Sequence, residues 1–369
     1  MRWLGFTLLA AGCVAAACWG PAQLWPTTAA PDGVYGRAGD GPSGLALLSA
    51  QAEKGALQAD VPRPASAANP PSPASPPVTA VAEPFLPEVA EAACTTLLPR
   101  LPGLSRAQCV ATRLQASGAL SRQGAPLYWR DVPSHAGAAA KGEPAAEPLR
   151  VLVVGAMHGD ELTAASLALR WIGMAAAEGA VDAGEPAPVH WRFIPVLNPD
   201  GLLAPKPTRV NAGGVDLNRN FPTPGWAEEA PVYWEKRTRK DPRRWPGHTP
   251  LSEPESRFLH QQMDQFQPQL VVSIHAPYGV LDFDGPHDPP LRLGRLRMDK
   301  LGVFPGSLGH YGGLHRGVPV VTIELEHALR MPPDAEVRAM WRDLRHWMNT
   351  RLLDGADAVA GVKPPGLQR

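Results

Sequence analysis

Three residues of this chain have the types and the spacing of a catalytic zinc site. His158 and Glu161 form an HxxE pair in VLVVGAMHGDEL, and His275 ends the apolar run LVVSIH far downstream. Catalytic zinc commonly has three protein ligands, often two histidines and one carboxylate, and keeps its fourth position for water. An HxxE pair also arises by chance in a chain with 11 histidines, so the surrounding elements must decide its meaning.

Apolar runs of strand length alternate with segments of helical spacing from residue 149 onward. The candidate strands are LRVLVVGA, VHWRFIPVLN, QLVVSIHA and VPVVTIELE, and the candidate helices include LTAASLALRWIGMAAAE. A further helix is expected to start with a capping box formed by Ser252 and Glu255. Runs that are apolar on both faces and separated by helices predict an α/β fold. Its sheet would be mixed, mostly parallel, and covered by helices on both faces.

The carboxyl ends of these strands carry four residues that suit metal-assisted hydrolysis. His158 and Glu161 follow the first strand. His275 ends the third strand, and Glu324 lies near the end of the fourth. Open α/β sheets bind their ligands at this edge, so we expect the four side chains to converge. We therefore predict one zinc ion per chain, held by His158, Glu161 and His275.

The remaining segments differ from this part in composition. Residues 1–20, MRWLGFTLLAAGCVAAACWG, combine one basic residue, a short apolar core and small residues, which is typical of an export signal. Cys13 lies in AAGC, which loosely resembles a lipoprotein cleavage box. Residues 21–90 are rich in Pro and Ala and lack apolar periodicity, so we expect a disordered tether. The catalytic domain is expected at 91–355, followed by a flexible tail at 356–369.

These segments predict an exported protein, periplasmic or extracellular, with a lipid anchor if Cys13 is modified. Of the four cysteines, two lie inside the predicted signal. In an oxidising compartment Cys94 and Cys109 are expected to form a disulfide, and two unpaired buried thiols are the alternative. Lys+Arg and Asp+Glu balance at 35 each, so no overall charge favours nucleic acid or an anionic membrane as a partner.

The segment NPDGLLAPKPTRVNAGGVDLNRNFP lies between the candidate ligands. Together with GAMHGDE, SEPE, the strand-end His275 and TIEL, it resembles in order and spacing the zinc carboxypeptidase family typified by carboxypeptidase A. The similarity covers roughly Gly124 to Leu353. It implies the family's fold, a zinc cofactor and hydrolysis of a peptide bond.

The resemblance also implies a role for each matching residue. Glu324 matches the general base, and Arg209 matches the arginine that polarises the scissile carbonyl. Asn218 and Arg219 match the pair that grips the carboxylate of the residue being removed. From the pattern alone Glu326 shares a strand face with Glu324 and stays open as the base, although the TIEL match favours Glu324. The family's mobile tyrosine has no evident counterpart, because the tyrosine of GHYGG follows the matching segment instead of preceding it.

Two further segments, HAPYGVLDFDGP and FPGSLGHYGGLHRGVPVVTIELEHA, resemble murein peptide amidases. Those enzymes cut the γ-D-glutamyl–diaminopimelate bond of cell-wall peptides, so an acidic pocket is expected for the amine of diaminopimelate. Asp282 and Asp284 could supply it, and a DFDG turn is the alternative. The amidases usually have Pro after EL in the TIEL region, where this chain has Glu326, and this departure leaves the substrate open.

The resulting hypothesis is a zinc hydrolase that acts on a small peptide substrate, with a cell-wall peptide as the leading candidate. One alternative is a general metallocarboxypeptidase, which removes C-terminal amino acids. A second is an aspartoacylase-like deacylase of N-acyl amino acids, which shares GxxHGxE and DLNRxF but does not account for NPDG and SEPE. A non-catalytic binding module would be expected to have lost a ligand or the base.

Overall fold

The computed structural model describes residues 86–133, 147–178 and 188–353. The predicted export signal, Cys13, most of the predicted tether and the C-terminal tail lie outside the described residues. Helix α1 (Pro87–Leu97) begins shortly before residue 91, where we placed the start of the catalytic domain. In the part of the chain that is described, no helix is long and apolar enough to cross a membrane.

A seven-stranded mixed sheet organises the described residues, in the order β1-β2-β4-β3-β5-β9-β6. The strands are β1 (Gln115–Leu120), β2 (Pro126–Val132), β3 (Leu149–Val154), β4 (Val189–Ile194), β5 (Leu270–His275), β6 (Leu281–Asp284) and β9 (Val320–Glu324). The central strands β4, β3, β5 and β9 pair in parallel, whereas both edges of the sheet pair antiparallel. The predicted α/β fold with a mixed sheet is confirmed. A separate two-stranded hairpin consists of β7 (Arg292–Leu293) and β8 (Leu296–Arg297).

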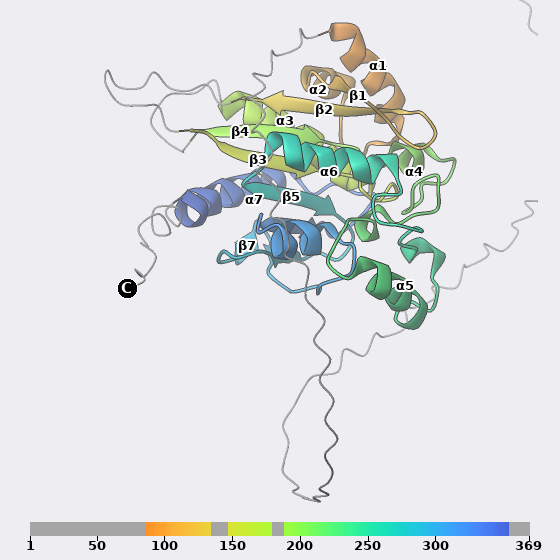
Figure 1. Cartoon of the computed structure of the whole chain (residues 1–369). Coiled ribbons are helices and arrows are strands. Elements are labelled where there is room, and N and C mark those ends of the chain that lie inside the picture. Colours follow the sequence, from red (N-terminus) through yellow and green to blue (C-terminus); the bar gives the residue numbers. More distant parts are fainter. Residues whose placement is uncertain (1–85, 134–146, 179–187, 354–369) are drawn as a thin grey trace, which may run out of the picture. The chain divides into compact units, whose positions relative to one another are not determined.

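Helices cover both faces of the sheet (Figure 1). The α-helices after α1 are α2 (Arg106–Ala111), α3 (Leu162–Glu178), α4 (Pro199–Leu203), α5 (Trp226–Lys236), α6 (Pro254–Phe266) and α7 (Asp334–Trp347). Short 3-10 turns are η1 (Leu98–Arg100), η2 (Leu217–Arg219) and η3 (Pro242–Arg244), and η4 (Gly309–His315) and η5 (Met348–Leu353) are π-helical. One buried apolar cluster includes side chains of α3 and α7, and a second includes side chains of α6 and η4.

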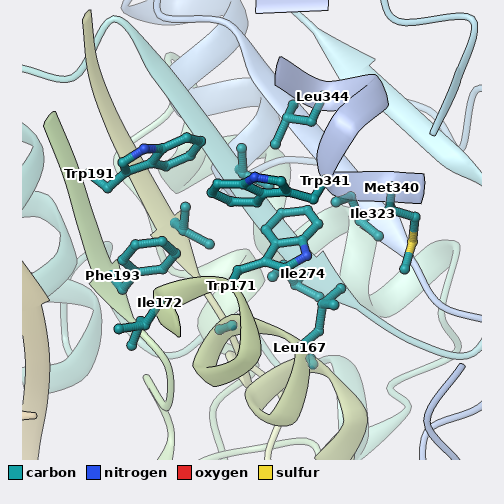
Figure 2. Close-up of a cluster of buried hydrophobic side chains, with 14 of the residues drawn as sticks. Leu167, Trp171, Ile172, Trp191, Phe193, Ile274, Ile323, Met340, Trp341 and Leu344 are labelled. Atoms are coloured by element: carbon teal, nitrogen blue, oxygen red, sulfur yellow. The ribbon is translucent and has the colours of Figure 1, made fainter. Parts of the chain in front are cut away.

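Three tryptophans fix α3 and α7 against the sheet. Trp341 of α7 packs on Trp171 of α3 and on Trp191 of β4, with ring centroids 5.3 and 4.7 Å away (Figure 2). All three side chains are buried, and large buried aromatic rings contribute strongly to core stability. Because α3 begins at Leu162, directly after Glu161, this packing also fixes the position of that carboxylate.

The alternation of side chains along β5 and β9 decides which residues face the site. Val272 and Ile274 of β5 point into the α3/α7 cluster, so Ser273 and His275 lie on the opposite face of the sheet. On β9, Val321 and Ile323 do the same, which leaves Thr322 and Glu324 on the face of His275. The parallel register pairs His275 with Glu324, so the two side chains are direct neighbours.

The expected capping box at the start of α6 is wrong. The helix begins at Pro254, its N-cap is Glu253, and no side chain caps it. The Ser252 hydroxyl instead donates to Glu253, while the Glu255 carboxylate accepts from the Asn211 amide. Both glutamates are buried, and their hydrogen bonds tie α6 to the loop that precedes η2. The pattern was misread because these carboxylates bind distant partners instead of the helix end.

The predicted disulfide between Cys94 and Cys109 is confirmed. It joins α1 to α2, both cysteines are buried, and their Cα atoms are 5.9 Å apart. The bond closes a loop with a sequence separation of 15. In the chain-entropy description, closing such a loop stabilises the folded state by about 3 kcal/mol.

We predict that Cys94 and Cys109 resist thiol labelling in the folded protein until a reductant is added, because both sulfur atoms are in the disulfide. Peptide mapping of the labelled protein reports each cysteine separately. The Cys94→Ser/Cys109→Ser double variant should lose about 3 kcal/mol of unfolding free energy in urea titration. Labelling of both cysteines without prior reduction would contradict the disulfide.

Candidate active site

The three predicted zinc ligands converge at the carboxyl ends of β3 and β5. The Glu161 carboxylate lies 2.8 Å from His158 Nδ1 and 3.0 Å from His275 Nδ1. The two Nδ1 atoms are 3.1 Å apart. All three side chains are buried, and their ligand atoms lie within 4.8 Å of one another. Within the described ranges, no other His, Cys, Asp or Glu side chains form such a group of three.

The outer nitrogen of each histidine already has a partner. His158 Nε2 contacts Asp216 Oδ1 at 3.1 Å, and His275 Nε2 contacts the Ser273 hydroxyl at 2.9 Å. Such outer contacts fix the ring orientation of metal-binding histidines and leave the other nitrogen for the metal. Both Nδ1 atoms therefore face the same small space beside a carboxylate, and a cation there would remove their mutual repulsion. This donor set fits zinc.

Electrostatics hold Glu161 and His275 in their metal-binding forms. For His158, burial alone would lower the pKa, but the charges of Glu161 and Asp216 outweigh it and raise that pKa. Burial alone would raise the pKa of Glu161, but the charges and hydrogen bonds of His158 and His275 outweigh it and hold the pKa well below its ordinary value. Burial lowers the pKa of His275, which favours the neutral imidazole. Metals bind an ionised carboxylate and a neutral imidazole, so both shifts favour metal binding.

The loop that carries the HxxE pair requires a glycine at position 159. A Cβ atom there would lie 2.2 Å from the carbonyl carbon of Gly201 in α4, which is too close for any side chain. Ala156, just before this loop, has a φ of 41°, and its carbonyl accepts from the backbone of Asn198 at 3.0 Å. The close approach to the NPDG segment therefore holds His158 and Glu161 in place.

Arg209 lies beside the ligands as predicted. Its Nη1 is 3.2 Å from His158 Nδ1 and 3.6 Å from Glu161 Oε1. Two of its other nitrogen atoms, Nε and Nη2, each lie 3.0 Å from Asp216 Oδ2. Asp216 therefore holds the Arg209 guanidinium at the edge of the metal site. There the guanidinium can stabilise negative charge that develops on a carbonyl oxygen.

Glu324 is the last residue of β9 and lies opposite His275 in the register. It is buried, and its Oε2 has no hydrogen-bond partner in the described structure. Burial, with the nearby charge of Glu161, raises the pKa of Glu324 to about 8. The expectation that Glu326 shares its strand face is wrong, because β9 ends at Glu324 and Glu326 is exposed beyond it. The geometry therefore favours Glu324 as the base.

Asn218 and Arg219 belong to η2, which Asp216 caps by accepting from the backbone N–H of Asn218 at 3.0 Å. The Arg219 guanidinium is buried and lies 4.4 Å above the ring of Phe304. Its Nη1 donates to a backbone carbonyl, but its Nε finds no partner among the described residues. Burial lowers the pKa of Arg219 to about 10. A buried N–H without a partner is costly, so this guanidinium suits an incoming carboxylate.

Asp282 and Asp284 lie on β6, so the alternative reading of DFDG as a turn is wrong. In the antiparallel register Asp282 is opposite Thr322, which places it on the sheet face that carries Glu324. Burial raises the pKa of Asp284 to about 6, and the charge of Asp282 adds to this shift. A Cβ at position 309 would lie 2.0 Å from Asp284 Oδ2, so the glycine of GSLGHYGG is required for η4 to pack on β6.

Tyr311, the tyrosine of GHYGG, packs between η4 and α6. Its ring is buried and stacks on Phe221 with centroids 5.6 Å apart. Its hydroxyl lies 2.6 Å from His260 Nδ1. These contacts hold η4 against α6.

Residues 111–284 match the family model described as zinc carboxypeptidase. This segment of the chain is similar to zinc carboxypeptidases. The matched residues include the three ligands, Arg209, the η2 pair and Asp282. Glu324 lies beyond the matched residues, so its assignment rests on the geometry and on the TIEL motif.

Murein peptide amidase A proteins are similar in sequence. The protein of Escherichia coli strain K12 is 34% identical over 164 residues, which are 43% of this chain and 57% of that protein. The protein of Vibrio campbellii is 33% identical over 146 residues, or 35% of this chain and 54% of that protein. The chain therefore spans little more than half the length of these curated relatives.

Solved structures with a similar fold include murein-tripeptide amidase MpaA from Escherichia coli O157. The two chains share 23% sequence identity, and their alignment covers 69% of this chain and 93% of the amidase chain, with a TM-score of 0.42. Bovine thrombin-activatable fibrinolysis inhibitor shares 15% identity with this chain. The alignment covers 75% of this chain and 97% of the inhibitor chain, with a TM-score of 0.47.

Sequence reasoning missed Asp216 and Ser273, the partners of His158 and His275. Asp216 is fully buried within GVDLNRNF, and a carboxylate inside an otherwise apolar and amide-rich stretch was the available signal. Ser273 interrupts the apolar run LVVSIH two positions before the ligand, on the same strand face. The cavity of about 490 Å³ lined by Asp200, Thr208 and Asn211 contains none of the predicted site residues.

We predict that His275→Ala abolishes stoichiometric zinc binding, because one of three ligands is removed from a buried site. Metal analysis after dialysis measures the zinc content of the purified protein. His346→Ala is the control, because His346 is exposed on α7 and outside the ligand group. Undiminished zinc in the His275→Ala protein would refute the ligand assignment.

We predict that Glu324→Gln lowers kcat by at least about 100-fold and retains zinc, because the proton acceptor is lost while the ligands stay. The matched control is Glu326→Gln, which should remain close to wild type because Glu326 is exposed beyond β9. Turnover and zinc content are measured on both proteins. A loss confined to Glu326→Gln would move the base by two positions.

Proposed function

We propose that this chain hydrolyses an amide bond next to a residue with a free carboxylate, with one zinc ion at His158, Glu161 and His275. The observation that carries the proposal is the convergence of three buried ligand groups whose outer contacts are already made. The nearby carboxylate of Glu324 and guanidinium of Arg209 complete the set that zinc hydrolysis requires.

Zinc held by these ligands would supply a Lewis acid that polarises a carbonyl and makes water more acidic. Glu324 can accept a proton from water, because its Oε2 is unpartnered, and can return that proton to the leaving nitrogen. Arg209, held by Asp216, would donate to the carbonyl oxygen as negative charge develops.

The substrate's free carboxylate would be bound by Asn218 and Arg219. The Asn218 side-chain oxygen accepts from the backbone of Leu308 at 2.8 Å, so its amide NH₂ group remains to donate to a ligand. The unpartnered Nε of Arg219 provides a charged donor in a site shielded from water. A carboxylate would satisfy both groups, whereas a neutral terminus would leave the guanidinium unpaired.

The proposed substrate class is a murein peptide cut at a γ-D-glutamyl–diaminopimelate bond. The similarity to proteins named murein peptide amidase A supports this class. The acidic pair on β6, Asp282 and Asp284, offers a counter-charge for the amine of diaminopimelate on the sheet face of the ligands. General carboxypeptidase and deacylase activities are the competing possibilities, and a panel of murein tripeptide, C-terminal dipeptides and N-acyl amino acids distinguishes them.

We also propose that the protein is exported to a periplasmic or extracellular location, with a lipid anchor if Cys13 is modified. The buried disulfide between α1 and α2 supports an oxidising compartment. The amino-terminal composition provides the rest of the support.

We predict that amidating the terminal carboxylate of the substrate lowers kcat/KM by at least about 100-fold, because Arg219 would then stay buried and unpaired. Steady-state kinetics on the free and amidated forms of one peptide measure this loss, and a chelator should abolish hydrolysis of both forms.

A second comparison concerns the acidic pair: Asp282→Asn should weaken hydrolysis of a diaminopimelate peptide more than that of a simple dipeptide.

Little change on amidation would refute the carboxylate site. An equal effect of Asp282→Asn on both peptides would instead favour a general carboxypeptidase activity.

A further inference from the structure

A short segment at the end of α5 carries an excess of positive charge that the proposed function does not use. Residues 236–244 read KRTRKDPRR and contain six basic residues and one acidic residue. The chain as a whole has equal numbers of basic and acidic residues, 35 of each. We call this segment the cationic rim, and its charge is therefore a local feature.

The backbone of the cationic rim is held in one conformation. The Trp234 indole donates to the carbonyl of Asp241 at 2.8 Å, and the Trp234 carbonyl accepts from the backbone of Lys240 at 2.9 Å. The Thr238 hydroxyl also donates to the Trp234 carbonyl. Arg239 and Lys240 have φ angles of 55° and 59°, which place two long cationic side chains in a left-handed turn that favours Gly or Asn. Their charges are thus presented from a rigid turn.

Half of these cations lack an acidic partner. Arg243 pairs with Asp160 at 2.8 Å, Lys240 with Glu235 at 3.4 Å, and Arg244 with Asp241 at 3.6 Å. The structure shows no carboxylate of the described residues within ion-pair distance of the other three, which are exposed: Lys236, Arg237 and Arg239.

The cationic rim contacts the loop that carries His158 and Glu161. Arg243 contacts Asp160, which stands in the chain between the ligands His158 and Glu161. The next residue, Arg244, is close enough to Arg219 to add to the lowering of its pKa, of which burial is the main cause. Figure 1 shows α5 beyond the carboxyl end of β5, on the opposite side of the molecule from α7. The carboxyl-terminal end of the cationic rim is therefore close both to the loop of the HxxE pair and to Arg219.

We propose that the cationic rim binds a second carboxylate of the substrate, on the acyl side of the scissile bond. The inference rests on the proposed function and narrows its substrate class to peptides with more than one carboxylate. An ordinary peptide bond leaves no backbone carboxylate on that side. A γ-glutamyl bond does, because the α-carboxylate of the glutamyl residue stays free when the side chain forms the amide. The unpaired cations thus match the feature that distinguishes a γ-glutamyl substrate.

Binding affinity tests the proposal separately from hydrolysis. The two peptides to compare are L-Ala-γ-D-Glu-diaminopimelate and the same peptide with only the glutamyl α-carboxylate amidated. In zinc-loaded Glu324→Gln protein, calorimetry at about 0.01 M ionic strength should show about five- to ten-fold tighter binding of the free acid, as expected for several exposed charges. The triple variant Lys236→Gln/Arg237→Gln/Arg239→Gln in the same background should lose most of this preference. About 1 M salt should also remove most of the preference for the free acid, because it shortens the electrostatic screening length to about 3 Å.

The matched control removes three exposed cations elsewhere, as Arg297→Gln/Arg338→Gln/Arg342→Gln on β8 and α7. It should keep the preference for the free acid. The proposal is overturned if the rim variant keeps the preference, if it weakens both peptides equally, or if the control variant loses as much. Hydrolysis by protein that retains Glu324 is a separate measurement, and a failure there counts against the proposed function alone.

Discussion

The buried carboxylate of Asp216 is the interaction on which the site depends. One of its oxygen atoms contacts His158 Nε2 and accepts from the backbone N–H of Asn218, and the other binds Arg209. It thereby orients His158, which is a proposed metal ligand, Arg209, which is proposed to face the reacting carbonyl, and the turn that carries Arg219. Burial opposes its ionisation, but Arg209 and His158 outweigh burial and hold its pKa well below the ordinary value. The charge is therefore present wherever the protein is folded at neutral pH.

The sheet supplies the second constraint. Parallel pairing of β5 with β9 places His275 beside Glu324, and a shift by one residue would turn both side chains into the α3/α7 core. The tryptophan contacts between α3, β4 and α7 resist such a shift, because close-packed cores do not deform continuously. Core packing far from the chemistry thus fixes the distance between base and ligands.

Unsatisfied groups mark the places where a substrate completes the structure. Glu324 Oε2 and Arg219 Nε are both buried, and neither has a hydrogen-bond partner among the described residues. A buried polar group without a partner destabilises a fold, so its retention at a site points to a ligand that satisfies it. The acidic pair on β6 and the cationic rim add charged groups to these sites. Together they fit the proposed substrate, which has an amine and several carboxylates.

The sequence by itself determined the group of His158, Glu161 and His275, the α/β fold and the disulfide, because chemical type, strand-length runs and chain spacing are local properties. It also named Arg209, Asn218 and Arg219 through their motifs. Only the tertiary structure separated Glu324 from Glu326, placed Asp282 on a strand instead of a turn, and showed Glu255 bound to Asn211 instead of capping α6. It alone revealed Asp216 and Ser273 as partners of the ligands. These features depend on where a strand ends and on which side chains meet across loops, and both are set by packing between segments that are distant in sequence.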